Sequence, residues 1–577
     1  MPSPSDLLGP LVTAAIAAAF GDDYKDTDPV LRPGQLSDLQ SNAALALARR
    51  VGMPPALAAA RIVENLDVAG VCDDVQVSGP GFINLTLANE WIGVQAGDMA
   101  ADPRLGVPRQ PMQVVPIDYS APNVAKEMHV GHLRTTVVGD SLARTLEHLG
   151  HSVVRQNHVG DWGTPFGMLI EHLLEVGEGS EDARALEVDP NAFYQGARSR
   201  FDGDPEFANR SRARVVALQG GDPETLRLWA ETVELSKHYF NRIYRTLGVT
   251  LTDADLAGES MYNDLLAGIC DELEAKGIAT VSQGALCVFL DGYTGREGKP
   301  VPLIIRKSDG GYGYDTTDLA TIKYRVQELH GDRILYVIGA PQALHLNMVW
   351  DTARKAGWLP DDVRPVHVQI GNVLGEDRKI LRTRSGTPVR LMALLHEAIE
   401  NARGVVDQSR PDLDDATREA VARQVGIGAV KYADLSVSHD SEYVFDLDRM
   451  LSLAGNTGPY MQYAVARVRS IFRAGGVDLG GPGHRIVVRE PGERALALAL
   501  LGFGGVVTHV GDELEPHRLC GYLFDLAQLF SSFYENCPVL KAEDPATRES
   551  RLALCALTLR VLVQGLDLLG VEAPEQM

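Results

Sequence analysis

The alternation of apolar and polar positions is most regular in the middle of the chain, where a strand, a helix and a second strand follow one another. Residues 113–118 form a short apolar run typical of a buried strand. A helical stripe follows, made of Val138, Leu142, Leu146 and Leu149, and Gly150 ends it. Ser152–Arg155 then has the pattern of the next strand. One such βαβ unit predicts a parallel, doubly wound sheet.

A second half with the same pattern comes much later in the chain. We expect a strand at residues 334–338, a helix over roughly Ala343–Ala356 and a strand at residues 366–370. The residues at about 174–276 between the two halves have mostly helical patterns. The prediction is therefore an α/β, Rossmann-like domain over residues 111–410 with a helical insertion.

The two flanks have different patterns. Residues 1–110 predict a small α/β domain, with helices near 10–20, 42–51 and 55–65, strands at 75–77 and 82–87, and a Gly-Pro-Gly turn at 79–81. A linker rich in proline and arginine closes this domain at residues 102–111. From about residue 411 the pattern is helical and rich in leucine, so residues 411–577 predict an α-helical bundle.

Composition adds limits to this picture. A chain of 577 residues with 45% apolar content can form several separate cores. Its six cysteines form no Cys-x-x-Cys pair, so we expect neither a disulfide framework nor a zinc site, and no other metal site. The apolar run at residues 11–20 lacks the flanks of a signal peptide and is too short to span a membrane. We expect a cytoplasmic protein with no membrane partner.

The net charge of −23, from 54 basic and 77 acidic residues, would by itself argue against a nucleic-acid-binding protein. The objection is limited, because a protein that binds RNA needs only a local basic track. The rest of an acidic surface can repel non-specific polyanions. Charge alone therefore leaves nucleic-acid binding open.

The candidate chemistry lies between the first predicted strand and helix, at His129-Val-Gly-His132. In sheets of this kind ligands bind at the carboxyl ends of strands, and a helix N-terminus offers N–H groups and partial positive charge to a phosphate. Gly131 allows a nucleotide to approach the backbone closely, and imidazoles can hydrogen-bond phosphate or ribose oxygens. We favour nucleotide binding here over a histidine pair that only caps the helix.

The segment resembles the first signature motif of class I aminoacyl-tRNA synthetases, and the chain as a whole resembles the arginyl-tRNA synthetase family. The similar runs are Asn157-His-Val-Gly-Asp-Trp-Gly163, Gly79-Pro-Gly-Phe-Ile-Asn84, Tyr312-Gly-Tyr-Asp-Thr-Thr-Asp318, Gly426-Ile-Gly-Ala-Val-Lys-Tyr-Ala-Asp434, Gly455-Asn-Thr-Gly-Pro-Tyr-Met-Gln-Tyr-Ala464 and Phe530-Ser-Ser-Phe-Tyr-Glu535. They span nearly the whole chain.

The resemblance implies an arginine–tRNA ligase that uses ATP. The carboxylate of L-arginine would attack the α-phosphorus of ATP to give an adenylate, and the terminal ribose hydroxyl of tRNA(Arg) would then take the arginyl group. Neither step needs a protein nucleophile, so catalysis would depend on positioning and electrostatics. Mg²⁺ would arrive with ATP. The resemblance also implies a monomer that does not bind DNA, and adenylate formation that can require bound tRNA.

Matching the family residue by residue gives an amino-acid site in two parts. Asp118, Ser120, Asn123 and His132 would hold the α-amino and carboxylate groups, and Tyr314, Asp318 and Gln342 would form a guanidinium pocket. A guanidinium has five donors and no acceptor, so a carboxylate, an amide oxygen and a phenol suit it. The run from Tyr314 to Asp318 also predicts a helix start with Thr316 or Thr317 as the N-cap, and both interpretations can hold at once.

The second class I motif, a mobile loop rich in lysine and serine, is degenerate. The chain has Lys379-Ile-Leu-Arg-Thr-Arg-Ser-Gly386, in which Thr383 stands at the position of the second lysine. The resemblance assigns ATP to Arg382, Thr383 and Arg384, together with His129, Gly131 and His132. It assigns a substitute catalytic role to Lys126, beside His129 and His132. A solvated basic loop is the alternative for the degenerate segment.

Other positions bear on tRNA. Tyr460, Gln462, Tyr463 and Arg467 lie near the start of the predicted bundle and could stack on or hydrogen-bond unpaired bases, although packing inside the bundle is the alternative for each. The chain departs from the family at residues 437–440, which lack the usual basic run, and at Ala454, where the family usually has glutamate. The departure at residues 437–440 motivates one rival, a specialised or repurposed synthetase paralogue that serves a secondary pathway or resistance to an inhibitor. Another rival is a non-catalytic tRNA-binding protein, and the retention of His129, His132, Asp118 and Lys126 together speaks against it.

Overall fold

The computed structural model describes residues 3–34, 37–163, 165–184, 189–295, 298–382, 388–478, 485–542 and 544–577. The chain divides into two compact units. The first unit comprises Met1–Arg109, Tyr460–Asp567 and Ala573–Met577, and the second unit comprises Gln110–Pro459 and Leu568–Glu572. The segment Leu568–Glu572 therefore belongs to the second unit although the chain on either side of it belongs to the first.

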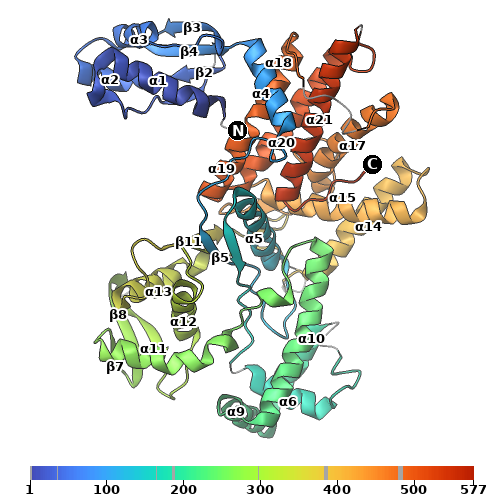
Figure 1. The fold of residues 1–577 in the computed structure, drawn as a ribbon. Coiled ribbons are helices and arrows are strands. Elements are labelled where there is room, and N and C mark those ends of the chain that lie inside the picture. Colours follow the sequence, from blue (N-terminus) through green and yellow to red (C-terminus); the bar gives the residue numbers. More distant parts are fainter. Residues whose placement is uncertain are drawn as a thin grey trace. The chain divides into compact units, whose positions relative to one another are not determined.

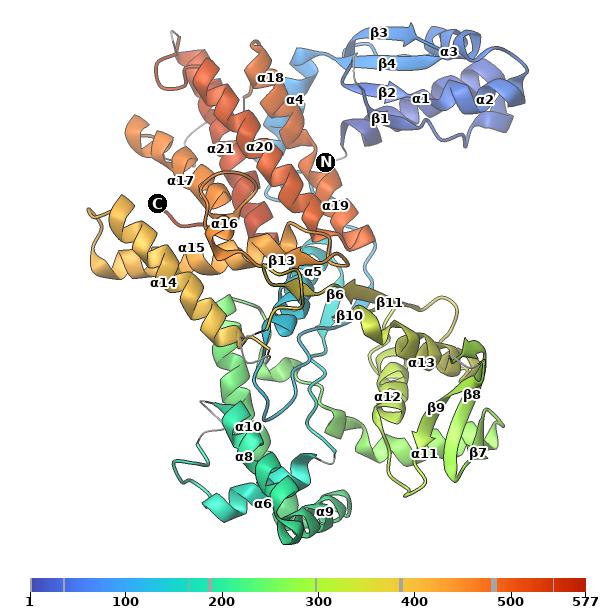
Figure 2. The same cartoon turned by 180° about the vertical axis from the view of Figure 1, so that it is seen from behind.

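The second unit contains the parallel sheet that the sequence predicts, in the order β6-β5-β10-β11 (Figures 1 and 2). Its strands are β5 (Val114–Asp118), β6 (Ser152–Arg155), β10 (Arg333–Gly339) and β11 (Arg364–Ile370). β5 and β10 lie side by side in the middle, with Leu335 opposite Ile117 and Tyr336 opposite Asp118. The predicted α/β class and the strand positions are confirmed.

Helix α5 (Val130–Leu149) packs against β5, β6 and β10 through the apolar stripe that the sequence predicts. Its glycine at position 139 lies directly on the strand, because a Cβ atom added there would stand 2.3 Å from Cβ of Tyr119. Gly150, with φ of 104°, ends the helix in a left-handed conformation that favours glycine. The first turn of α5 is thereby fixed next to the carboxyl end of β5.

A region between the two halves was missed by the sequence analysis. Three antiparallel strands, β7 (Ala279–Ser282), β8 (Ala285–Thr294) and β9 (Pro300–Arg306), form a separate sheet. Helices α11 (Asn263–Ala275), α12 (Tyr314–Gln327) and α13 (Ala343–Ala356) share a buried core with these strands and with β10. This core fixes α12 and α13 with respect to each other.

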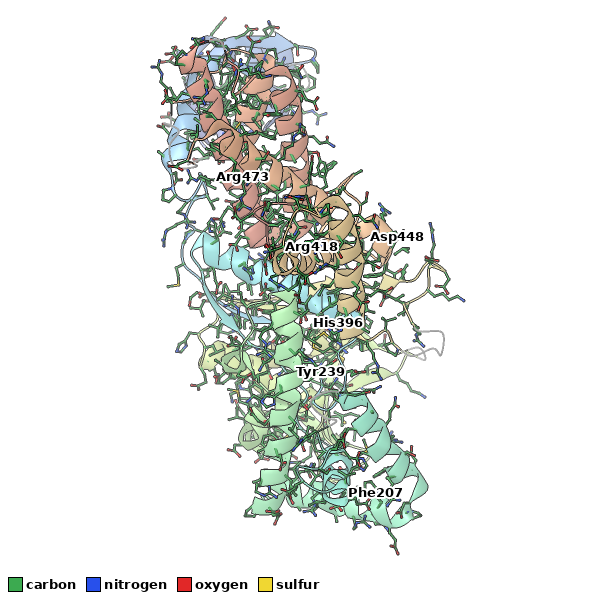
Figure 3. The ribbon with its side chains drawn as sticks, turned by 90° about the vertical axis from the view of Figure 1, so that its right-hand side faces the viewer. Phe207, Tyr239, His396, Arg418, Asp448 and Arg473 are labelled. Atoms are coloured by element: carbon green, nitrogen blue, oxygen red, sulfur yellow. The ribbon has the colours of Figure 1, made fainter. Side chains whose placement is uncertain are left out.

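The predicted helical insertion is present within the second unit. It contains α6 (Pro165–Val176), α8 (Pro190–Gly203), α9 (Pro205–Gln219) and the long α10 (Pro223–Leu247). Phe207 of α9 and Tyr239 of α10 are buried within it (Figure 3). Short 3₁₀ turns at Asp253–Asp255 and Glu259–Tyr262 lead back towards α11.

Helices α14 (Leu391–Ser409) and α15 (Asp415–Leu435) pack on each other and on α5, within the second unit. The short elements β12 (Val373–Leu374), β13 (Tyr443–Val444) and α16 (Leu447–Met450) complete this part. Leu568–Glu572 packs here as well: Ser141 Oγ of α5 donates to the Leu568 carbonyl at 3.0 Å, and Leu569 and Val571 are buried.

The first unit begins with the predicted small α/β domain. Helices α1 (Pro4–Phe20), α2 (Ala43–Val51) and α3 (Pro55–Glu64) pack with an antiparallel sheet in the order β1-β2-β4-β3. Its predicted strands are β3 (Cys72–Ser78) and β4 (Phe82–Leu87), and two short strands, β1 (Leu31–Pro33) and β2 (Leu39–Ser41), were not predicted. α4 (Asn89–Ala101) follows.

The rest of the first unit is a helical bundle. We expected the bundle to begin at about residue 411, but α15 and α16 belong to the second unit, so the bundle of the first unit begins with α17. It consists of α17 (Gly458–Gly475), α18 (Pro491–Leu501), α19 (Phe503–Glu513), α20 (Pro516–Asn536) and α21 (Pro545–Leu568). Among the described residues, one stretch, Pro491–Glu513, is long and apolar enough to cross a membrane. It is divided at Gly502 into α18 and α19, whose apolar side chains pack against α20, so this stretch has the character of a bundle core.

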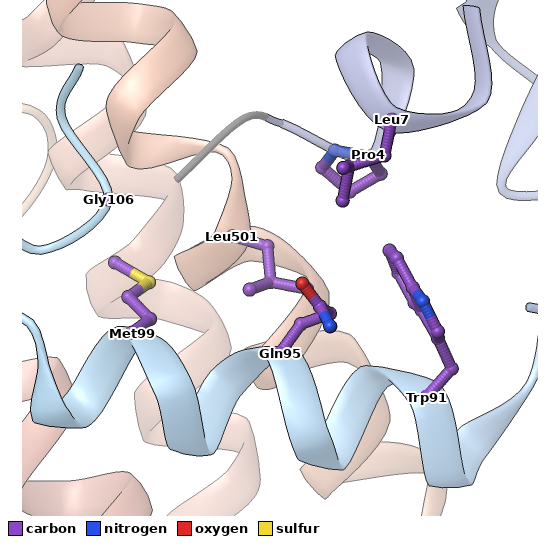
Figure 4. Close-up of a pocket in the computed structure, with 7 residues that line it drawn as sticks. All are labelled: Pro4, Leu7, Trp91, Gln95, Met99, Gly106 and Leu501. Atoms are coloured by element: carbon purple, nitrogen blue, oxygen red, sulfur yellow. The ribbon is translucent and has the colours of Figure 1, made fainter. Parts of the chain in front are cut away.

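A small cavity lies between α1, α4 and α18 in the first unit. Figure 4 shows Pro4 and Leu7 of α1 facing Trp91 and Gln95 of α4, with Leu501 beside them. Its volume of about 10 Å³ holds no more than one water molecule. This cavity is too small to be a ligand site.

Candidate active site

The carboxyl end of β5 continues into an unusual backbone turn. Ser120 and Ala121 have φ of 73° and 46°, a left-handed conformation that is unfavourable for residues other than glycine. A buried polar network holds this turn. Ser120 Oγ lies 2.8 Å from the Tyr244 hydroxyl, Asn157 Nδ2 donates to that hydroxyl at 3.0 Å, and Ala121 N donates to Asn157 Oδ1 at 3.0 Å. The helical insertion, through Tyr244, thus supports the loop that leads to α5.

His129 and His132 cap the N-terminus of α5 reciprocally. Gly131 N donates to His129 Nδ1, and His129 N donates to His132 Nδ1, both at 3.1 Å. The ring centroids are 4.1 Å apart. The capping pair considered as an alternative is therefore real, but each ring uses only its Nδ1 atom for it.

The two imidazoles are neutral. Burial lowers the pKa of His129, and burial together with the neighbouring His129 ring lowers the pKa of His132 to about 3. Since Nδ1 of each ring accepts a hydrogen bond, the single proton of each neutral ring is on Nε2. The backbone therefore fixes both histidines as Nε2–H donors.

The degenerate second motif is connected to the same helix start. Val130 N donates to the Val389 carbonyl at 3.1 Å, and Leu391 N donates to the Met128 carbonyl at 2.9 Å. Arg382 is exposed, while Thr383 and Arg384 lie outside the described residues. An open depression of about 920 Å³ extends along residues 374–382, between Asn372 and Glu442.

Lys126 and Asn123 lie on the loop between β5 and α5. Lys126 is exposed, and its ammonium nitrogen is 5.1 Å from the centroid of the Tyr194 ring, a cation–π contact. Asn123 is also exposed and pairs through its backbone with Gly160, where an added Cβ would stand 2.3 Å from Asn123 Oδ1. The run from Asn157 to Gly163 thus packs against this loop.

Asp118 makes a buried ion pair. Its Oδ2 accepts from Nη2 of the fully buried Arg325 at 2.9 Å, and His158 N donates to Oδ1 at 3.4 Å. Arg325 also lies over the Tyr336 ring, 4.8 Å from its centroid. Asp118 therefore balances a protein cation, and a substrate ammonium group would have to share this carboxylate with Arg325.

Two of the residues predicted to bind a guanidinium, Tyr314 and Asp318, lie in the first turns of α12, and His345 contacts both. Asp318 Oδ2 lies 2.5 Å from His345 Nε2, and the Tyr314 ring meets the His345 ring edge-on at a centroid distance of 4.9 Å. Gln342 is exposed in the 3₁₀ turn Ala340–Gln342, at the end of β10. Burial raises the pKa of Tyr336 to about 12, and the charges of both Asp118 and Asp318 contribute, so the two parts of the site lie around this residue of β10.

The helix start predicted at these residues is confirmed, but the predicted N-cap is wrong. Gly313 is the N-cap, and Thr316 and Thr317 lie within the first turn of α12. Their hydroxyls donate to the carbonyls of Ile305 and Gly313 instead of accepting from helix N–H groups. Threonine serves as a cap only when its oxygen accepts.

One functional candidate was missed. Burial, together with the charges of Asp161 and Asp318, raises the pKa of Glu259 to about 7. The Glu259 carboxyl therefore lies close enough to Asp318 for their charges to interact. A single glutamate among 77 acidic residues carries no signal in the sequence, because only the 3₁₀ turn that follows the insertion brings it next to α12.

The departure at residues 437–440 has a structural role. His439 Nδ1 lies 2.8 Å from the Gln369 carbonyl, and Gly371 N donates to the His439 carbonyl at 2.8 Å, so this segment secures the end of β11. The buried Arg134 of α5 donates to the carbonyls of Ser438 and Ser441 and pairs with Asp434 at 3.0 Å. The segment therefore connects α5 to the sheet. Ala454 lies in an exposed turn.

The four candidate tRNA contacts on α17 differ in exposure. Tyr463 is 44% exposed, whereas Gln462 is fully buried and packs inside the bundle. The ring centroids of Tyr460 and Phe524 are 5.5 Å apart, and Cζ of Arg467 lies 5.4 Å from the centroid of the Tyr534 ring. A contact through exposed side chains on this helix can therefore include Tyr463 but not Gln462.

Within the described ranges, no group of three or more His, Cys, Asp or Glu side chains is placed to hold a metal ion.

Three family models match the chain. Residues 99–447 match the class I tRNA synthetase catalytic domain of the arginine type, residues 461–577 match the DALR anticodon binding domain, and residues 7–87 match the arginyl tRNA synthetase N terminal domain. The first match alone covers more than half of the chain. The chain belongs to the arginyl-tRNA synthetase family. The resemblance seen in the sequence is thereby confirmed.

Known proteins agree with this membership over the full length. The chain is 69% identical over 577 residues to an arginine–tRNA ligase of Thermobifida fusca, with 100% of both chains covered. It is 53% identical to one of Frankia casuarinae, with 98% of each covered. Among solved structures, an arginyl-tRNA synthetase of Plasmodium falciparum has a TM-score of 0.84 at 27% identity over 100% of both chains. One of Thermus thermophilus has a TM-score of 0.79 at 27% identity, covering 99% of this chain and 100% of its own.

Proposed function

We propose that this chain is an arginine–tRNA ligase, which joins L-arginine to tRNA(Arg) with ATP through an arginyl-adenylate. The observation that carries the proposal is one site that combines two recognition elements. An acidic pocket built from Asp318, Glu259 and the Tyr314 hydroxyl suits a guanidinium, and the N-terminus of α5 suits a phosphate. The first turn of α5 follows the carboxyl end of the parallel strand β5, and His345, which contacts Asp318, follows the carboxyl end of its neighbour β10.

The first step is a displacement at phosphorus. A carboxylate oxygen of arginine forms a bond to the α-phosphorus of ATP, and the bond from that phosphorus to the bridging oxygen of pyrophosphate breaks. Pyrophosphate leaves with the electron pair. His129 and His132, fixed as neutral Nε2–H donors, stabilise the negative charge that builds on the phosphate oxygens without having to exchange a proton.

The remaining charge on the triphosphate is met by cations. Lys126 is free to move from the Tyr194 ring to the phosphates because it is exposed. Arg382, with Thr383 and Arg384 beside it, belongs to the same proposed ATP site, together with the backbone at Gly131. Mg²⁺ comes as the counter-ion of ATP and is part of that substrate.

The α-amino and carboxylate groups of arginine would lie between Asp118, Ser120, Asn123 and His132. Asn123 is exposed on the loop, and the left-handed turn at Ser120 determines the path of the chain between β5 and α5. Tyr314, Asp318 and Gln342 would surround the guanidinium. In this assignment the bound arginine would extend from the end of β5 to the start of α12, past the side of Tyr336.

In the second step the terminal ribose hydroxyl of tRNA attacks the arginyl carbonyl, and AMP leaves. We assign the anticodon side of tRNA recognition to the bundle of α17 to α21, where Tyr460, Tyr463 and Arg467 lie on α17, and the elbow to the domain at residues 1–110. Residues 111–410 carry the chemistry. We further propose that the protein is a cytoplasmic monomer with neither DNA nor a membrane as partner.

The test is aminoacylation of total tRNA with each labelled amino acid in the presence of ATP and Mg²⁺. We expect charging by arginine only, and loss of charging in Asp318→Ala and in His132→Ala. His396→Gln, an exposed position on α14, is the control that keeps full activity (Figure 3). Charging by another amino acid, or no charging by a protein that still binds ATP, would contradict the proposal.

The rival functions are not favoured. The 69% identity to an arginine–tRNA ligase covers the whole of both chains, and the departure at residues 437–440 is accommodated in the packing of β11 and α5. Neither observation calls for a specialised paralogue or a non-catalytic protein.

A further inference from the structure

His345 is the residue that connects the components of the guanidinium pocket. It lies in the first turn of α13, and its ring contacts three residues of the first turns of α12. Nε2 is 2.5 Å from Asp318 Oδ2, Nδ1 is 3.4 Å from Asp315 Oδ1, and the Tyr314 ring meets it edge-on. Neither nitrogen is left for the substrate.

A ring that bonds carboxylates through both nitrogens needs a proton on each of them. Burial would lower the pKa of His345, but the hydrogen bonds and charges of Asp315 and Asp318 outweigh this and raise the pKa to about 9. The ring is consequently a cation at neutral pH, held between two anions.

Asp315 anchors this arrangement to the neighbouring sheet. Its Oδ2 accepts from Ile304 N of β9 at 2.9 Å, which fixes its Oδ1 toward His345. On the other side of His345, its Nε2 bonds Asp318 Oδ2. In the part of the chain that the structure describes, no group bonds Asp318 Oδ1, so this oxygen is left to the pocket.

The imidazolium also adjusts the charge of the pocket. Without a charged His345, Asp315 and Asp318 would be two unbalanced anions, which attract any cation, including the compact ammonium of lysine. With His345 charged, Asp315 is neutralised and Asp318 keeps one oriented oxygen. An oriented acceptor discriminates by geometry, which suits a planar guanidinium better than a point charge.

We propose that His345 is a positioning residue that determines amino-acid specificity: as a cation between Asp315 and Asp318, it orients Asp318 toward the guanidinium and prevents the pocket from accepting other cations. This inference rests on the proposed function, because it assigns Asp318 to arginine. His345 does not touch the substrate and acts only through its two partners.

The experiment measures arginine and lysine charging by the full chain with His345→Ala and His345→Gln, beside His396→Gln as the substitution control. We expect the KM for arginine to rise about 10-fold or more in His345→Ala, as the loss of a charged hydrogen bond implies, with kcat and the KM for ATP changed less than about threefold. His345→Gln, which can still donate to Asp318 but carries no charge, should lie between. The ratio of arginine to lysine charging should fall in the same order.

A second measurement reads the charge of His345 directly in the unmodified chain. Carbon-13 labelling of the histidine ring, followed by NMR over pH 5 to 10, should show one ring, assigned by its absence in His345→Gln, that stays cationic at pH 7.5. A ring that titrates near pH 6.5, or a KM for arginine that is unchanged in His345→Ala, would overturn the inference. Failure of the unmodified chain to charge arginine would instead overturn the proposed function.

Discussion

The histidines at the start of α5 combine two tasks on separate ring atoms. Nδ1 of each ring caps the helix, and the proton on Nε2 is left for a ligand. Asp318 divides its oxygens in the same way, with Oδ2 bonded to His345. The residues that we propose for the chemistry thus also satisfy the protein's own structure, and substitutions can separate the two roles.

Replacing His129 by asparagine should remove the chemistry and keep the cap. Asparagine is among the best N-cap residues, so the thermal midpoint should change little, whereas kcat should fall about 100-fold or more because the donor to the phosphate is lost. His129→Ala should lose both functions and cost about 1 kcal/mol of stability. Thermal unfolding and pyrophosphate release measure the two effects. Equal activity in His129→Asn and the unmodified chain would refute this division of roles.

The charged state of His345 predicts how stability depends on pH. Its pKa is about 6.5 in the unfolded chain and about 9 in the folded chain, because the carboxylates of Asp315 and Asp318 lie next to it on α12. The other groups around this pair are Tyr314, whose ring contacts His345, and Glu259, whose charge interacts with that of Asp318. The stabilisation is fully present below pH 6.5 and is lost as pH rises through 9. The difference in thermal midpoint between the unmodified chain and His345→Gln should therefore shrink from pH 7 to pH 10. A constant difference would argue against an ionised His345.

The signature residues could be found from the sequence because they occupy a contiguous motif next to a clear strand. Glu259 and His345 could not, since their roles arise from contacts with Asp318 across long sequence separations. Gln462 belongs to a recognisable run, but its burial follows from the face of α17 on which it lies. The identity of these residues was readable, but their environment was not.

Among the elements, α5 is the one that unites the site. It begins at the histidines, packs on three strands, and binds the 437–440 segment through Arg134. The strands on which α5 packs, and the strands of the second half of the sheet, were predictable because a buried parallel strand is a nearly continuous apolar run. The antiparallel strands β7 to β9 were not, because their burial is irregular: Val281 and Phe289 are exposed while Val288 and Ile305 are buried.

The contact between α5 and the end of β5 predicts the effect of one methyl group. In Gly139→Ala the new Cβ would stand 2.3 Å from the Tyr119 side chain, so Tyr119 and the adjoining Ser120 turn must shift. We expect a loss of about 1–3 kcal/mol, as in other overpacked cores, and a lower kcat. Thermal unfolding and aminoacylation measure both.

Gly268 of α11 provides the matched control. An added Cβ there meets nothing within 4 Å, so Gly268→Ala should stabilise the protein by about 0.5–1 kcal/mol through the helix preference for alanine. If both alanine variants behaved alike, the close approach of α5 to Tyr119 would have no energetic consequence.

For the whole molecule, the division into two units does not follow the order of the chain. The second unit includes Leu568–Glu572, and its carboxylate at Glu572 receives hydrogen bonds from Arg423 and Gln424. Periodicity along the sequence predicts a helix at α21, but it holds no information about which unit the segment Leu568–Glu572, which begins at the last residue of that helix, joins. Only the packing of Leu569 and Val571 decides that.

Two glycines with similar backbone angles test how much this segment contributes. Gly570 (φ 65°) lies where an added Cβ would stand 2.9 Å from Lys431 Nζ and 3.2 Å from Asp140 Oδ2, whereas Gly476 (φ 60°) has nothing within 4 Å. Both alanine variants carry the left-handed backbone cost of about 1–2 kcal/mol. Gly570→Ala should lower the thermal midpoint further and reduce charging by arginine. Equal midpoints would mean that the segment contributes little to the second unit.

This placement of Leu568–Glu572 also sets the order in which the molecule can be completed during synthesis. A ribosome delivers residues 110–459 early, and domains generally fold as units while translation continues. The second unit must nevertheless wait for more than a hundred further residues, including all of α18 to α21, before the five that cover Ser141 and Lys431 emerge. An aminoacylating protein released early by truncated translation would therefore lack a piece of its catalytic unit, not only a piece of its tRNA-binding bundle.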